Sequence, residues 1–210
     1  MSPKNIIVFG AHPDDIEIGM GGTIRKLSSA GNTVYSCVTS IPDSHERRKS
    51  EAREAATILG VKDVFFLNFE LADLGFNRKT INAIDTIINT LKPHSVFTHW
   101  VEDSHQDHAN TTRCVIAATR KNDFNVIMYE QTIPGGITPA AFRAQYFIDI
   151  TPHIDAKIES IRAHKSQMEK NGDWWLEGIR GRAMYRGYQI RSKFAEAFEI
   201  IKMKENIDLF

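Results

Sequence analysis

The sequence lacks several features that would place it in a specialised class of protein. Its 210 residues include two cysteines, Cys37 and Cys114, which lie far apart in apolar surroundings. This spacing argues against a disulfide framework and against a cysteine-rich zinc site. No apolar run approaches 18 residues, so we expect no membrane-spanning helix. The first residues lead into a short apolar stretch without the features of a signal peptide, which favours a cytoplasmic location.

The chain also lacks a net charge. Lys and Arg total 26 and Asp and Glu total 26, so the formal net charge is zero. Nucleic-acid-binding proteins usually carry a basic excess, and proteins that bind membrane surfaces often carry polybasic segments, so we expect neither partner. A chain of this length buries roughly 70% of its unfolded surface. With no repeat, low-complexity tract or linker, residues 1–210 are expected to form a single domain.

Short apolar runs alternate with helical patterns over the first two thirds of the chain. Strands are expected at residues 6–9, 33–39, 64–67, 95–100 and 125–130. Helices are expected at residues 19–30, 44–59, 80–91 and 107–120. This βα alternation predicts a Rossmann-like, doubly wound α/β fold, in which helices cover both faces of a mostly parallel sheet.

The last third of the chain has a different pattern. It predicts strands at residues 145–150 and 196–201 and helices at residues 154–170 and 174–193. The aromatic and arginine-rich segment 171–187 fits a pocket wall or a subunit interface, and it fits a helix with a core side and a surface side equally well.

Polar side chains follow the first expected strand directly. His12, Asp14, Asp15 and Glu17 lie within eight residues of the end of that strand. Ligands of open α/β sheets bind beyond the carboxyl ends of the strands, so a site is expected here. Adjacent carboxylates repel each other unless a cation or a proton intervenes. Helix capping would explain one aspartate but not the other acidic groups and the imidazole.

Three glycines after this cluster, Gly19, Gly21 and Gly22, raise the alternative of a phosphate-binding loop. The dinucleotide fingerprint needs its first glycines immediately after the strand. Residues 12–15 occupy that position here, and their two acids would repel a pyrophosphate. We therefore expect the glycines to permit close packing of a helix against the sheet.

A second polar cluster, residues 99–108, follows the fourth expected strand. Its His-x-Asp-His segment, residues 105–108, places two imidazoles three residues apart with a carboxylate that can orient one ring. In the common 3-2-1-4-5 strand order the first and fourth strands flank the point where the order reverses, so both clusters are expected to meet. A polar loop with exposed histidines is the simpler alternative, but it does not explain two such clusters facing each other.

The two clusters together predict a catalytic metal site. Histidine and aspartate both ligate Zn²⁺, and catalytic zinc sites typically use three protein ligands and leave one position for water. The remaining acidic and basic groups favour a metal-activated hydrolase.

The same segments resemble a known family. The two signature motifs of the PIG-L/LmbE family, zinc-dependent deacetylases of N-acetyl sugars, resemble AHPDDIEIGMGGT at residues 11–23 and HQDHAN at residues 105–110. Residues 48–61 resemble the family's R-x-x-E…LG helix, and residues 147–151 and 194–198 resemble its C-terminal segments. The resemblance covers most of the chain and is strongest to small bacterial members, which include bacillithiol-pathway and chitooligosaccharide deacetylases.

The resemblance implies a metal-binding set and a base. His12, Asp15 and His108 would ligate Zn²⁺, with Fe²⁺ as the alternative native metal. Asp14 would act as the general base that takes a proton from water.

The resemblance also implies roles around the substrate. His105 would stabilise the oxyanion or protonate the leaving amine, and Asp107 would orient it. Arg48 would contact the substrate, and Glu17 and Asp103 are further candidates on the substrate side of the site.

The implied substrate is a small N-acetyl amino sugar or glycoconjugate, and the implied assembly is a homo-oligomer, a trimer or a hexamer. Two features depart from the family pattern. Phe194 stands where relatives often have tyrosine, and residues 41–46 lack the glycine-rich acidic form of the corresponding loop. The identity of the substrate therefore stays open.

Two other functions are compatible with the motifs. One is a metal-dependent amidase that acts on a non-sugar substrate, and the other is a non-catalytic sugar-binding protein. Asp14 and His105 count against the latter, because metal binding alone would require neither of them.

Overall fold

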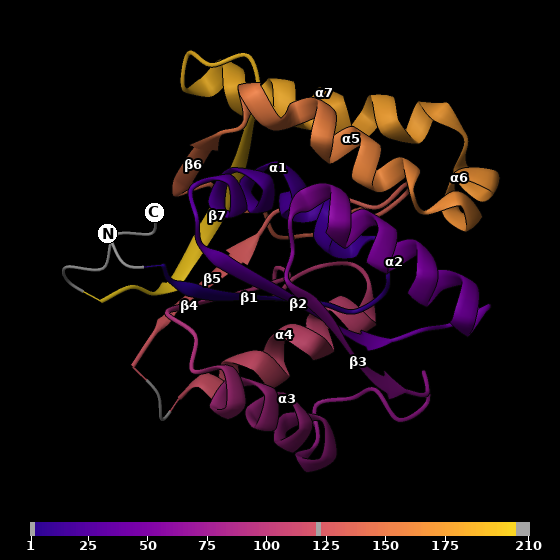
Figure 1. Cartoon of the computed structure of the whole chain (residues 1–210), viewed down its shortest axis with the longest axis vertical. Helices are drawn as coiled ribbons and strands as arrows, with labels where there is room; N and C mark the ends of the chain where they lie inside the picture. Colours follow the sequence, from indigo (N-terminus) through magenta and orange to yellow (C-terminus); the bar gives the residue numbers. More distant parts are fainter. Residues whose placement is uncertain (1–2, 121–122, 205–210) are drawn as a thin grey trace.

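Seven strands in the described part of the chain form one sheet with helices on both sides (Figure 1). The computed structural model describes residues 3–120 and 123–204. The strands are β1 (Asn5–Gly10), β2 (Thr33–Ser40), β3 (Asp63–Phe69), β4 (Ser95–Thr98), β5 (Asn125–Tyr129), β6 (Tyr146–Asp149) and β7 (Ala195–Lys202). The α-helices are α1 (Asp15–Ser29), α2 (His45–Leu59), α3 (Arg78–Leu91), α4 (Gln106–Thr119), α5 (Ile154–Arg162), α6 (Lys165–Asn171) and α7 (Asp173–Gln189).

The strand order is β3-β2-β1-β4-β5-β7-β6. Strands β1 to β5 pair in parallel, whereas β7 pairs antiparallel with both β5 and β6. This arrangement confirms the predicted Rossmann-like, mostly parallel sheet. The order reverses between β1 and β4, which brings the two polar segments of the sequence to the same edge.

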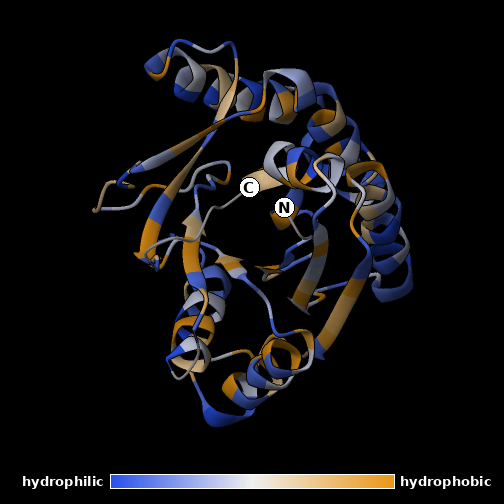
Figure 2. Ribbon diagram, turned by 60° about the vertical axis from the view of Figure 1, so that its left-hand side comes forward, coloured by the Kyte–Doolittle hydropathy of each residue, from blue (hydrophilic) through white to orange (hydrophobic). Residues whose placement is uncertain are grey.

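The central strand β1 is buried on both faces, as its continuous apolar sequence predicts. Ile6 and Val8 pack into a core cluster with side chains of α1, α5 and α7, and Ile7 and Phe9 pack into a second cluster with α3 and α4. The helices carry hydrophobic and hydrophilic positions in alternation, whereas the strands carry long hydrophobic stretches (Figure 2). Within the described residues, no helix is long and apolar enough to cross a membrane.

All predicted elements except the single helix at residues 154–170 are present, and most of their ends agree within about two residues. Two ends differ by more. Helix α1 begins at Asp15 rather than at residue 19, because Asp14 takes a left-handed backbone conformation directly before it. Helix α7 ends at Gln189 rather than at residue 193, because the backbone of Arg191, with a φ of 60°, is not helical.

The single helix expected at residues 154–170 is wrong, because the segment forms α5 and α6 with a break between them. The break lies at His164, whose ψ of 66° is not helical. It turns the buried His164 imidazole toward Glu17, with His164 Nε2 3.4 Å from Glu17 Oε2. The amphipathic pattern of the sequence continues across the break. The pattern alone therefore does not predict a break that depends on this tertiary contact.

Helix α1 is itself interrupted at Met20, whose φ of −145° and ψ of 27° are not helical. The interruption leaves backbone groups without partners inside the helix. The Glu196 carboxylate on β7 accepts hydrogen bonds from Gly22 N at 3.0 Å and from Thr23 N at 2.7 Å. A side chain near the end of the chain therefore acts as an internal cap for the first helix.

Lys157 on α5 completes the other side of this interruption. Its ammonium donates to the carbonyl oxygens of Glu17 at 3.0 Å and Ile18 at 2.8 Å, and it pairs with Glu196 at 2.5 Å. Lys157 is 1% exposed, and burial lowers its pKa. Because a buried ion pair is costly unless its remaining hydrogen-bonding groups are satisfied, these backbone contacts explain how the pair is tolerated.

Gly19 permits close packing of α1 against the sheet, as predicted, whereas Gly21 faces Lys157 on α5 and Gly22 faces Ile150 just after β6. A Cβ atom added at Gly19 would lie 2.2 Å from Tyr129 Cδ2, well inside van der Waals contact. The Tyr129 ring cannot easily move away, because it is fully buried and its hydroxyl donates to Phe9 O at 2.9 Å. The absence of a side chain at Gly19 thus sets the distance between α1 and β5.

We predict that Gly19→Ala lowers the free energy of unfolding by about 1–3 kcal/mol, the usual range for overpacking a close contact. Urea denaturation followed by circular dichroism measures the change. The matched control is Gly181→Ala on α7, where an added Cβ meets nothing within 4 Å. The free energy of unfolding of this control should rise by about 0.5–1 kcal/mol, because alanine suits a helix interior better than glycine. Equal effects at both positions would contradict the packing argument.

Candidate active site

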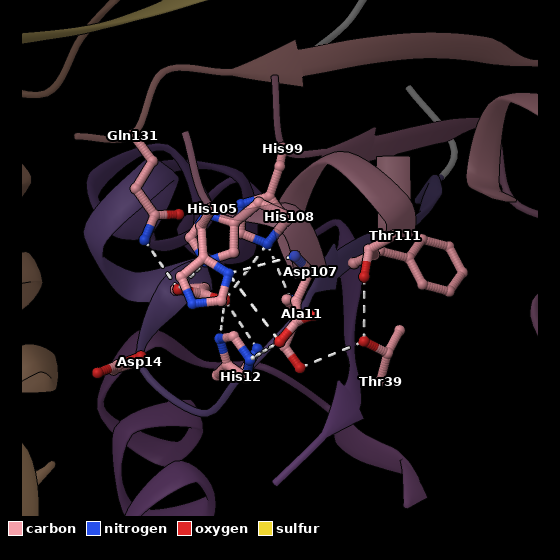
Figure 3. Close-up of polar contacts among 12 residues, drawn as sticks. Ala11, His12, Asp14, Thr39, His99, His105, Asp107, His108, Thr111 and Gln131 are labelled. Carbon is pink, nitrogen blue, oxygen red and sulfur yellow. Dashed lines mark hydrogen bonds and ion pairs between the residues drawn. The ribbon is translucent and has the colours of Figure 1, made fainter. Parts of the chain in front are cut away.

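The two polar segments meet at the carboxyl ends of β1 and β4, beside a cavity of about 440 Å³ (Figure 3). The first segment connects β1 to α1, and the second connects β4 to α4. The cavity is lined by residues from both segments, from α2, from the loop after β5 and from the C-terminal helices: His12, Asp14, Asp15, Ile18, Pro42, Arg48, Leu71, His105, Gln106, Asp107, His108, Gln131, Thr132, Ile133, Pro134, Gln167, Asn171 and Trp175.

The buried Asp15 carboxylate is the meeting point of these segments. Its Oδ2 accepts the backbone N–H of His12 at 2.7 Å and lies 3.3 Å from His99 Nε2. Its Oδ1 accepts Gln131 Nε2–H at 2.8 Å and lies 3.3 Å from His108 Nε2. Burial alone would raise the pKa of Asp15, but the His108 and His99 imidazoles hold it well below its usual range. The carboxylate is therefore ionised in the interior of the protein.

His108 lies between two carboxylates. Its Nε2 faces Asp15, and its Nδ1 lies 2.9 Å from Asp103 Oδ2. Burial would lower the pKa of His108, but Asp15 and Asp103 outweigh burial and raise it to about 10. Asp103 also accepts the backbone N–H of His105 at 2.8 Å, so it fixes the start of α4 as well as one imidazole ring.

His12 and His105 lie beside this pair, and Asp107 contacts both. His12 Nε2 is 3.1 Å from Asp107 Oδ2, and His12 Nδ1 is 3.5 Å from Asp15 Oδ2. His105 Nδ1 accepts the backbone N–H of Asp107 at 3.2 Å, whereas the Asp107 carboxylate is 4.0 Å from that nitrogen. The backbone of Asp107, more than its carboxylate, thus orients His105. Burial and the neighbouring His108 lower the pKa of His105.

Asp14 lines the cavity in a strained backbone conformation. Its φ is 106°, a value that residues other than glycine rarely adopt and that is found mainly where the surrounding structure imposes it. Burial and the charge of Asp15 raise the pKa of Asp14 to about 7. The two adjacent carboxylates therefore differ in proton affinity, with Asp15 ionised and Asp14 able to exchange a proton near neutrality.

Arg48 extends from α2 into the wall of the cavity and is 4% exposed. Its Nη2 donates to Pro13 O at 2.7 Å and lies 3.9 Å from Asp14 Oδ1. Its Nη1 is 4.0 Å from Asp43 Oδ1, and its Nε has no hydrogen-bond partner among the described residues. The guanidinium therefore keeps donor capacity beside Asp14.

Glu17 and Asp103, the remaining predicted residues, contact site residues but do not line this cavity within the described structure. Glu17 pairs with His164, and Asp103 holds His108. That Glu17 and Asp103 bind the substrate remains a prediction.

The C-terminal helices contribute to the pocket wall through Asn171 and Trp175, whereas Trp174 is exposed. Part of segment 171–187 thus lines the pocket. Phe194 is not part of the wall, because its side chain is 1% exposed and packs in the core cluster of α1 and α7. The lack of a hydroxyl at position 194 therefore has no direct consequence for the cavity.

The residues at this site suit a divalent cation. Two sets of three side chains have ligand atoms within 4.8 Å of one another: His12, His105 and His108, and Asp15, His99 and His108. Of the predicted ligands, His108 belongs to both sets, His12 to the first only and Asp15 to the second only, so the set of His12, Asp15 and His108 stays a prediction. The Asp103–His108 contact matches the carboxylate–histidine arrangement that orients imidazole ligands in metal sites. A buried cluster of this composition, with a carboxylate that stays ionised, fits Zn²⁺ or Fe²⁺.

Sequence reasoning missed three residues of this region. His99 belongs to the second polar segment, and its position at the end of a strand was a usable signal. Gln131 follows β5 at the same sheet edge, but a single amide in a loop has no distinctive pattern. His164 is separated from the motifs by a long stretch of chain, and no local feature pointed to it.

Comparison with known proteins places this site in context. The GlcNAc-PI de-N-acetylase (PIG-L) family model matches residues 7–119, which include both polar segments. The chain is 28% identical to diacetylchitobiose deacetylase of Thermococcus kodakarensis, over 94% of this chain and 83% of that protein. It is 31% identical to the uncharacterized deacetylase YaiS of Escherichia coli, over 78% of this chain and 91% of that protein. Among solved structures, N,N'-diacetylchitobiose deacetylase from Pyrococcus horikoshii matches with a TM-score of 0.80 and 27% identity, over 94% of this chain and 84% of that chain.

Proposed function

The chain belongs to the PIG-L (GlcNAc-PI de-N-acetylase) family, and on that premise we propose that it hydrolyses the N-acetyl group of an amino sugar or its conjugate and releases acetate. The observation that carries the proposal is the convergence of the Asp14 and Asp15 carboxylates and the His12, His105 and His108 imidazoles on one cavity. The similarity to diacetylchitobiose deacetylases supports an N-acetylglucosamine-type substrate.

We propose that the enzyme depends on a divalent cation, Zn²⁺ or Fe²⁺, held by His12, Asp15 and His108. Such a cation supplies Lewis-acid polarisation of a carbonyl and makes water more acidic. Asp15 contributes the negative charge, and Asp103 holds His108 in the orientation needed for binding.

The proton transfers are assigned to Asp14 and His105, which both line the cavity. An Asp14 oxygen takes a proton from the water that attacks the acetamide carbonyl carbon. Nδ1 of the neutral His105 ring accepts the Asp107 N–H, so the acidic form carries protons on both ring nitrogens, with the Asp107 carboxylate, 4.0 Å away, as the partner for Nδ1–H. Protonated His105 gives its Nε2 proton to the leaving nitrogen, the C–N bond breaks, and acetate and the free amine result.

The pocket wall supports a small, polar substrate. A cavity of about 440 Å³ falls in the range of small-molecule sites, and it combines apolar side chains with a few polar groups. We propose that Arg48, which lines the cavity with its Nη2 3.9 Å from Asp14 Oδ1, donates to a substrate hydroxyl or carboxylate. A non-sugar amide stays as the alternative substrate class, whereas the intact Asp14 and His105 disfavour a purely sugar-binding role. That residues 1–210 form a single domain, that the protein self-associates and that it is cytoplasmic remain predictions.

We predict that the purified protein releases acetate from at least one member of a panel of N-acetyl amino sugars. Chelation should abolish this release, and Zn²⁺ or Fe²⁺ should restore it, because the buried Asp15 charge is placed to bind a cation. An acetate assay combined with elemental analysis makes the measurement, with N-acetylated amino acids as the non-sugar control. Full activity of metal-free protein would contradict the metal dependence, and activity on the amino acids alone would contradict the substrate class.

We predict that the two adjacent carboxylates respond differently to amide substitution. Asp14→Asn should keep the metal and lower kcat by roughly 10²- to 10⁴-fold, the usual range for loss of a general base. Asparagine is chosen because it tolerates the positive φ at this position better than alanine. Asp15→Asn should lose both metal and activity. If Asp14→Asn lost the metal while Asp15→Asn kept it, the two assignments would be reversed.

We predict that Arg48→Met lowers kcat/KM by roughly 10- to 100-fold, as expected for loss of a charged hydrogen bond, while metal content stays unchanged. The matched control is Arg53→Met, because Arg53 lies on the same helix and is exposed. Steady-state kinetics on the substrate found in the panel checks both variants. Unchanged kinetics in Arg48→Met would remove this residue from the binding site.

A further inference from the structure

Gln131 is a buried amide that contacts the site from an element that carries neither motif. It follows β5 and is 6% exposed. Its Nε2–H donates to Asp15 Oδ1 at 2.8 Å, and Figure 3 shows its side chain reaching toward the histidine cluster from the side opposite Thr39. Together with the His12 backbone N–H at Oδ2, this contact fixes the Asp15 carboxylate through both of its oxygens.

The orientation that Gln131 imposes matters for Oδ1 in particular. The same oxygen lies 3.3 Å from His108 Nε2. With one side of Oδ1 occupied by the Gln131 amide, its remaining acceptor capacity is directed toward His108. A cation bound by both Asp15 and His108 would contact the side of Oδ1 that the amide leaves open. The Gln131 amide therefore determines which side of Oδ1 faces the cation.

The chemical type of the donor also matters. A lysine or arginine at this position would neutralise Asp15 and compete with a cation. A glutamate would add a second negative charge and offer no donor when ionised. A neutral amide orients the carboxylate and leaves its charge available, so glutamine combines the two requirements.

The other end of the amide argues against a purely structural role. Gln131 Oε1 is buried and has no hydrogen-bond partner among the described residues. Buried polar atoms are normally paired, and an unpaired one costs free energy. A residue selected for packing alone would avoid that cost with an apolar side chain of similar size. The contact to Asp15 is the only hydrogen bond in the described structure that accounts for an amide here.

We propose that Gln131 is a positioning residue that holds Asp15 in its metal-binding orientation. The inference rests on the proposed metal-binding role of Asp15 and goes beyond it by assigning the support of that ligand to a loop outside both motifs.

Gln131→Met tests the proposal, because methionine keeps the length of the side chain and removes the donor. Zn²⁺ affinity is measured by competition with a chromogenic chelator, and the melting temperature is measured on metal-free protein. The Kd for Zn²⁺ should rise by roughly 10- to 100-fold, the usual effect of removing an outer contact to a metal ligand. At saturating Zn²⁺ most of kcat should return, because Gln131 does not itself transfer a proton.

Gln167→Met is the matched control. Gln167 lines the same cavity from α6, and its side-chain amide donates to Ser166 Oγ at 3.3 Å rather than to Asp15. Its Zn²⁺ affinity should equal that of the wild type. Gln131→Asn is the second variant, because it keeps the amide but is too short by one methylene to reach Asp15. It should weaken Zn²⁺ binding as Gln131→Met does, and it carries the test if the methionine variant fails to fold.

The outcomes separate the inference from its premise. Wild-type protein that binds no Zn²⁺ or Fe²⁺ would overturn the proposed metal centre itself. Wild-type protein that binds metal, with unchanged Kd in both Gln131 variants, would overturn the positioning role and leave the metal centre intact. A lower melting temperature of the metal-free Gln131 variants with unchanged Kd would assign Gln131 to stability alone.

Discussion

The Asp15 carboxylate is an ionised group buried at the junction of three chain segments, and the site is organised around the need to stabilise it. A buried charge is costly unless hydrogen bonds or opposite charge compensate for it. The compensation comes from the His12 backbone, from His99 and His108 beyond β4, and from Gln131 beyond β5. The partners lie in the segments that follow β1, β4 and β5 and on the first turn of α4, so the strand order brings them to the same edge of the sheet.

The order of the first five strands and the place of the site agree with local sequence patterns, whereas the antiparallel β7 between β5 and β6 was not predicted. Alternating strands and helices imply a parallel sheet, and in the resulting order the first and fourth strands are neighbours. The sequence alone therefore predicts that the two polar segments meet. The break between α5 and α6 could not be predicted, because it depends on the contact of His164 with Glu17 rather than on helical periodicity. The interruption of α1 at Met20 likewise depends on distant charges, Lys157 and Glu196.

The residues of the candidate site likewise fall into those that the sequence predicts and those that it does not. Residues of the two motifs were predictable because several ionisable groups crowd into short segments, a pattern that needs a chemical explanation. Gln131 was not predictable, because a single neutral amide in a loop has no such pattern and its meaning comes only from its contact with Asp15. The backbone contact of Asp107 with His105 also escaped prediction, since sequence suggests which side chains are near but not which atom makes the bond.

The internal cap of α1 has a consequence for the order in which the protein is built during translation. Strand β7 lies between β5 and β6 in the sheet, and its Glu196 closes the helix that carries Asp15. The ribosome releases this strand last among the described elements, long after both motif segments have emerged. Until β7 is inserted, the amides of Gly22 and Thr23 lack this partner. The helix that carries Asp15 therefore completes its hydrogen bonding only after the last described strand has been made, although Asp15 itself lies near the start of the chain.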